Sequence, residues 1–192
     1  AKTNNYNERL EQADKIEALL QEYKIPEIAL EYAKALGNVS NKADNYDKSL
    51  KQANKINELL KYYKTPEIAL VYAMALVNVS NKADNYNKSL EQANKIKALL
   101  KEYETPEIAL EYAKTLVNVS AKTNIYKESI EQADKVNELL KEYETPEIAL
   151  EYANALVNTS AKTNNYNESL EQADKIEALL QEYETPEIAL EY

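Results

Sequence analysis

Carboxylates are the most numerous side chains here that could do chemistry, with 33 Asp and Glu among 192 residues. Two carboxylates held close together can act as general acid and base. Here, however, they recur on the polar faces of every unit of a repeated sequence, which is typical of solvated helix surfaces. The chain has no His and no Cys, so it lacks the imidazole and thiol groups used in nucleophilic catalysis and as soft metal ligands. We therefore expect a protein that is not an enzyme and that binds no metal or cofactor.

Charge and hydropathy argue against two classes of partner. The formal net charge of −10 disfavours nucleic acid, whose phosphates are bound by clustered Lys and Arg. No apolar run approaches the roughly 18 residues that span a bilayer, and the N-terminal Ala-Lys-Thr-Asn-Asn has no apolar signal-peptide core. We expect no nucleic-acid or membrane partner and a cytoplasmic location, although a targeting sequence could precede this segment in a longer parent protein.

The elements that position the polar side chains repeat every 40 residues. The phrase Pro-Glu-Ile-Ala-Leu begins at five evenly spaced prolines: Pro26, Pro66, Pro106, Pro146 and Pro186. This period is typical of a solenoid, in which each unit buries its apolar face against its neighbours. A single Gly in the chain leaves little room for flexible linkers. We expect one solenoid domain over residues 1–192, made of units 1–40, 41–80, 81–120 and 121–160 and a partial unit 161–192.

Each unit is predicted to contain two helices. The first, called the leading helix below, begins at Pro66 in the second unit, where Thr65 can cap it, and ends near Lys82. The second helix runs from about Tyr86 to Tyr103. In both, the apolar residues follow helical rather than alternating spacing. Two antiparallel helices joined by a short turn, and stacked through both faces, make an α-solenoid.

The turn between the two helices carries turn-favouring residues. Asp or Asn stands at its first position in every unit, at 4, 44, 84, 124 and 164. Such residues tolerate a left-handed backbone, and their side chains can cap a helix. We therefore expect Asp84 and its equivalents either to be left-handed or to cap the second helix.

Small and large residues alternate along the first unit in a recognisable order, carried by Ala33, Leu36, Gly37, Ser40, Asn45, Tyr46, Ser49 and Ala53. This order resembles the tetratricopeptide repeat, and the resemblance covers the whole chain. It implies an all-α fold, a right-handed superhelix of antiparallel helix pairs.

The chain departs from that family in two respects. The tetratricopeptide period is about 34 residues, so the extra residues are expected in a longer second helix near Leu99 to Glu104. Gly37 is replaced in later units by Val77, Val117 and Val157, which should push the paired helices slightly apart. Armadillo and HEAT repeats, with periods of about 40 to 47 residues, are the rival. No Gly breaks residues 86–103 into the two short helices that an armadillo unit requires.

By the same resemblance, the leading helices line a concave binding surface. A column of Asn recurs along it, and an amide can hydrogen-bond the backbone of an extended peptide because it is both donor and acceptor. A column of Lys at 42, 82, 122 and 162 is expected beside it. The predicted ligand-binding residues are Lys34, Asn38, Val71, Met74, Asn78, Lys114, Asn118, Asn154 and Asn158.

The second unit departs most from the others on this surface. Val71 stands where other units have Glu, and Met74 where they have Lys or Asn. Residues three apart on a helix are neighbours on one face. This apolar pair is the expected binding spot, and drift among duplicated units is the alternative explanation.

Two functional interpretations follow. The first is a scaffold whose groove binds a protein or peptide partner. The alternative is a structural spacer or self-assembling rod, natural or engineered, with no specific ligand. The ends of the chain favour self-association, because each is expected to expose a face that fits another repeat. These faces comprise Tyr6, Leu10, Ala13, Ile16 and Leu20 at the start and Ile188, Ala189 and Tyr192 at the end.

Overall fold

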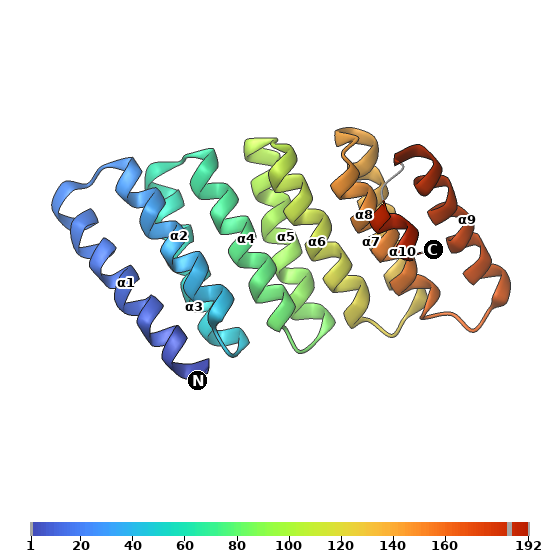
Figure 1. The fold of residues 1–192 in the computed structure, drawn as a ribbon, viewed down its shortest axis with the longest axis horizontal. Coiled ribbons are helices and arrows are strands. Elements are labelled where there is room, and N and C mark those ends of the chain that lie inside the picture. Colours follow the sequence, from blue (N-terminus) through green and yellow to red (C-terminus); the bar gives the residue numbers. More distant parts are fainter. Residues whose placement is uncertain (1, 184–185, 192) are drawn as a thin grey trace.

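The computed structural model describes residues 2–183 and 186–191, and every element within them is a helix. The helices follow one another in a regular row from α1 to α10 (Figure 1). The second helices are α1 (Lys2–Tyr23), α3 (Tyr46–Tyr63), α5 (Tyr86–Tyr103), α7 (Tyr126–Tyr143) and α9 (Tyr166–Tyr183). The leading helices are α2 (Pro26–Lys42), α4 (Pro66–Lys82), α6 (Pro106–Lys122), α8 (Pro146–Ser160) and α10 (Pro186–Glu191). The predicted all-α solenoid is confirmed, whereas the right-handed twist of the superhelix stays a prediction.

The leading helices begin where the Thr-Pro pair predicts. Thr65, Thr105 and Thr145 are the N-caps of α4, α6 and α8, and each hydroxyl accepts a hydrogen bond from the backbone N–H three residues later, at 3.3 Å. Proline follows as the first helical residue, where its missing N–H costs nothing. The N-cap of α2 is Ile25, which makes no such bond.

The turns differ in detail from the expectation. The second residue of the turn, not the first, caps α3 and α5: the side chains of Asn45 and Asn85 accept from the N–H groups of Lys48 and Lys88 at 3.0 Å. The Asp before each Asn accepts from that Asn and from the same Lys side chain. The left-handed residues lie instead at the opposite turn, after each second helix, at Lys24, Lys64, Glu104 and Glu144. There the residue just past the helix closes its last turn through its N–H.

The two kinds of helix form layers with different spacing. Each leading helix packs against the second helices on either side of it in the chain and also against the next leading helix. Small residues permit this approach: Ala75, Thr115 and Ala155 are fully buried, whereas Ala35, which has no leading helix before it in this chain, is half-buried. Within the described residues no two second helices come as close. The leading helices therefore form the tighter, inner layer of the row.

Long polar side chains bridge the wider spacing between second helices. Gln52, Gln92 and Gln132 are buried, although the sequence pattern places Gln among the polar surface residues. Each side-chain amide donates a hydrogen bond to the hydroxyl of a Tyr near the start of the preceding second helix. The acceptors are Tyr6, Tyr46 and Tyr86, at 3.3, 3.1 and 3.4 Å. Because a buried amide needs a partner, this ladder fixes the register of each unit on the previous one.

The faces at the two ends differ from those predicted. Ala13 and Leu20 are buried against the neighbouring helices, and so is Ile188, whereas Ala189 is exposed. Tyr192 lies outside the described residues. Of the predicted starting face, Tyr6, Leu10 and Ile16 are half-buried. Ile16 and Ala35 line a 300 Å³ cavity on the side where an internal unit receives the preceding leading helix. End-to-end association stays a prediction.

The missing cap of α2 gives a prediction about stability. Replacing Ile25 by Thr, the residue of the other units, should stabilise the chain by about 0.5 to 1 kcal/mol, because a hydroxyl would satisfy a helix N–H that lacks a side-chain acceptor. The urea midpoint measures the change. Thr105→Ala, which removes an existing cap, should lower the midpoint by a similar amount. A lower midpoint for Ile25→Thr would contradict this view of the cap.

The buried tyrosines of the leading helices predict an alkaline loss of stability. Burial raises the pKa of Tyr72, Tyr112 and Tyr152 to about 12 from the ordinary 10.0. The folded chain therefore keeps protons that the unfolded chain loses. Their stabilising effect is complete below about pH 10 and is lost as the pH rises toward about 12, by about 1.4 kcal/mol per pH unit for each residue. Urea unfolding between these pH values should show a shallower loss for Tyr112→Phe than for the parent chain. An equal slope would count against the proposed cause.

Candidate functional site

A cavity of 290 Å³ lies between the leading helices α2 and α4. Its lining residues are Lys34, Gly37, Asn38, Asn41, Val71, Met74, Ala75 and Asn78. Five of the predicted ligand-binding residues therefore meet around one space, although they come from two units. The remaining four, Lys114, Asn118, Asn154 and Asn158, lie farther along the row on α6 and α8.

The cavity exists because the only glycine of the chain faces the next unit. A Cβ atom added at Gly37 would lie 3.5 Å from Cγ1 of Val71, an ordinary van der Waals contact. The expectation that this position separates paired helices within a unit is therefore wrong, because its neighbour is the following leading helix. In later units Val77, Val117 and Val157 occupy the equivalent position. Among the leading helices of the described residues, α2 is thus the one that brings Gly rather than Val to this position.

Two further residues that differ from those of the other units, Val71 and Met74, line the same cavity as Gly37. The first and third units carry a Glu–Lys ion pair on this face, Glu31 with Lys34 at 2.8 Å and Glu111 with Lys114 at 2.7 Å. The second unit has Val71 and Met74 in place of both members, so no lone charge remains. Met74 is 49% exposed. An exposed, flexible thioether beside an open apolar space can adapt to a partner's side chain.

Three of the four predicted residues of the third and fourth units, Lys114, Asn154 and Asn158, already contact other residues of the chain. Glu111 is only 7% exposed and is paired with Lys114. Burial and the nearby Glu111 raise the pKa of Glu151, while Lys114 and a hydrogen bond from Asn154 act in the opposite direction. A partner would have to compete with these contacts to reach Lys114. Asn118 is half-buried on α6.

The Asn and Lys columns also connect neighbouring units. The Asn158 amide donates to the Ser120 hydroxyl at 3.1 Å and to the Val117 carbonyl at 3.4 Å. The Lys82 ammonium donates to the carbonyls of Asn41 and Asn78 at 3.3 and 3.4 Å. A cation at these carbonyls complements the negative end of the preceding helix dipole. The Lys82 ammonium is partly buried, and this burial lowers its pKa. The Lys column therefore connects neighbouring units in addition to lining a groove.

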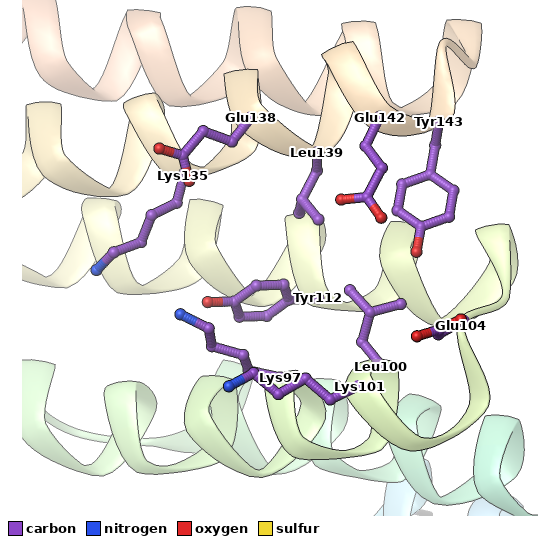
Figure 2. Close-up of a pocket in the computed structure, with 10 residues that line it drawn as sticks. All are labelled: Lys97, Leu100, Lys101, Glu104, Tyr112, Lys135, Glu138, Leu139, Glu142 and Tyr143. Atoms are coloured by element: carbon purple, nitrogen blue, oxygen red, sulfur yellow. The ribbon is translucent and has the colours of Figure 1, made fainter.

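A second cavity, which sequence reasoning did not identify, lies in the other layer (Figure 2). It has a volume of 250 Å³ and separates α5 from α7, with Tyr112 of α6 between them. The residues that line it are Lys97, Leu100, Lys101, Glu104, Tyr112, Lys135, Glu138, Leu139, Glu142 and Tyr143. A related cavity of 240 Å³ separates α7 from α9. The signal in the sequence was Lys97, which stands where other units have Glu or Asn.

The described part of the chain shows no arrangement typical of a metal site or of a membrane span. No group of Asp and Glu side chains there is arranged to hold a metal ion. No helix in the same residues has the length and apolar character needed to cross a membrane.

Three comparisons, with protein-family models, with curated proteins and with solved structures, find no match to this chain. The fold and the side chains that line the two cavities are therefore the features that bear on function.

The space beside Gly37 can be filled without strain, which gives a third prediction. Gly37→Ala should stabilise the chain by about 0.5 to 1 kcal/mol, because Ala is the better helix former and its methyl group meets only Val71. Urea unfolding measures the gain, and Ala75→Gly, the reverse change across the same cavity, should lose at least as much. Destabilisation by Gly37→Ala would show that the helices are closer here than described.

Proposed function

We propose that the chain is a tetratricopeptide-like interaction scaffold that binds a segment of a protein or peptide partner on its leading helices. The cavity between α2 and α4 receives an apolar side chain of that segment. The observation that supports this most is convergence: Gly37, Val71 and Met74 all depart from the other units, and all three line one cavity. The chain acts by presenting a surface, without catalysis and without nucleic acid.

The size and chemistry of the cavity favour a single apolar side chain as its occupant. Its 290 Å³ lies at the lower edge of the range of about 300 to 1,000 Å³ found for pockets that enclose a small molecule. Val71 and Ala75 form its apolar wall, and Met74 stands at its side. Burying one large apolar side chain there is worth about 1.5 to 3 kcal/mol.

The polar residues around the cavity fit the backbone of the same segment. Asn38 and Asn78 occupy equivalent positions one unit apart, and both line the cavity. Each amide can donate to a carbonyl and accept from an N–H of an extended chain. Lys34 completes the rim, with its ammonium paired to the exposed Glu31, and such an exposed pair is weak enough to be exchanged for a partner's carboxylate.

A structural spacer is the second candidate function. The contacts of Asn158 and Lys82 with the preceding unit favour it, because they use groove-facing side chains for stacking. A spacer needs no partner that binds between α2 and α4. A scaffold needs a partner that binds at this junction in preference to the junctions between later units.

Selection of binders from an unbiased peptide library, followed by calorimetry, tests the proposal. Met74→Lys should weaken the selected peptide by about tenfold or more, because the lost burial exceeds 1.4 kcal/mol. Asn154→Lys makes the matched change at the equivalent position of the fourth unit and should leave the affinity unchanged. Gly37→Val should also weaken binding by filling the cavity. Equal affinities for the parent chain and Met74→Lys would reject this site, and a library without binders would favour the spacer.

A further inference from the structure

The cavity between α5 and α7 is polarised from end to end. Figure 2 shows the ammonium groups of Lys97, Lys101 and Lys135 at the same end as the hydroxyl of Tyr112. The carboxylates of Glu104 and Glu142 lie toward the other end in this view, near Tyr143, whereas the Glu138 carboxylate lies at the lysine end. The lysine end thus holds three ammonium groups against one carboxylate, and its net charge is positive in a chain whose net charge is −10.

Lys101 lacks the acidic neighbour that its equivalents Lys61 and Lys141 have three residues earlier. Lys61 of the second unit is paired with Glu58 at 2.7 Å, but Ala98 takes the place of that Glu beside Lys101. The second and fourth units also have Lys at the position of Lys101, and both have Glu three residues earlier. The first and fifth units have Ala at the position of Ala98, and both have Gln in place of the Lys. In the described residues, neither Lys97 nor Lys101 has a carboxylate within ion-pair distance.

The position of Lys97 adds to this charge. It lies four residues before Lys101 on the same helix, where like charges are neighbours and repel. The third unit therefore gains one ammonium and loses one carboxylate on the same surface. Lys135 across the cavity is already paired with Glu131 at 2.9 Å, so the uncompensated charge belongs to Lys97 and Lys101.

The base of the cavity offers a neutral donor. Tyr112 is 5% exposed, and burial together with the nearby Glu138 carboxylate raises its pKa to about 12. Its hydroxyl therefore keeps its proton at neutral pH and can donate a hydrogen bond to an anion beside the two ammonium groups.

We propose that this cavity binds a phosphoryl group. Such a group carries close to two negative charges and three acceptor oxygens, which match the two unpaired ammonium groups and the Tyr112 hydroxyl. The volume of 250 Å³ is below that of pockets that enclose a whole small molecule, so the site takes one group rather than a nucleotide. Glu104 and Glu142 disfavour an anion at the other end, and Glu138 disfavours one close to α7, which leaves the side of the α5 lysines. The two lysines lie on the second helix α5, and the site does not use the residues of the cavity between α2 and α4.

Titration of the full chain with inorganic phosphate, at constant ionic strength maintained with chloride, tests this site. Backbone and lysine side-chain resonances measured by NMR should shift saturably at Lys97, Lys101 and Tyr112. Lys97→Asn, which restores the residue of the second and fourth units, should weaken binding by about tenfold. Lys141→Gln removes the same charge beside the related cavity between α7 and α9 and should have no effect.

The outcome can also identify the source of the group. Tighter binding of a phosphoserine peptide than of its unphosphorylated form and of inorganic phosphate would support a phosphoprotein partner, and equal binding of peptide and phosphate would support the free ion. Shifts that follow chloride equally, that never saturate, or that are lost equally in Lys97→Asn and Lys141→Gln would overturn the proposal.

Discussion

The close approach of successive leading helices is the constraint on which the rest of the structure depends. It is made possible by Ala75, Thr115 and Ala155, whose small side chains are fully buried at equivalent positions. Because one layer is tight, the second helices spread apart, and buried Gln side chains must reach across to Tyr hydroxyls. Both cavities follow from this geometry. One opens in the tight layer where Gly37 leaves out a side chain, and the other opens in the spread layer above Tyr112.

Features governed by local chemistry could be predicted from the sequence, and those governed by contacts between units could not. The Thr-Pro pair and helical spacing gave the bounds of α4 and α5, because capping and amphipathic burial act within a few residues. The neighbour of Gly37 was missed because Val71 lies in another unit. Burial of the Gln ladder was missed for the same reason. The left-handed residues Lys64 and Glu104 carry no local signal, since neither is a residue type that favours this conformation.

Paired changes distinguish both candidate sites from the repeated background. In the second unit, both members of the Glu–Lys pair become apolar, as Val71 and Met74. In the third unit, Lys97 appears beside Ala98, so a charge is added where its counter-charge is lost. In the second unit a single change would leave one member of the pair without its partner, whereas in the third unit the two changes together leave Lys97 and Lys101 without a counter-charge. Near-identical units thus provide a reference against which local chemistry can be recognised. Five of the predicted groove residues share one cavity, whereas Lys114, Asn154 and Asn158 contact other residues of the chain.

The central claim is that the junction between α2 and α4 binds a partner's apolar side chain. Met74 lines that junction and is the only Met in the chain, so an isotope-labelled methionine methyl group gives one NMR resonance. The account predicts that a peptide selected for binding will shift this resonance saturably, with the dissociation constant that calorimetry gives for the same peptide. A peptide that binds the chain while the Met74 resonance stays unchanged would contradict it.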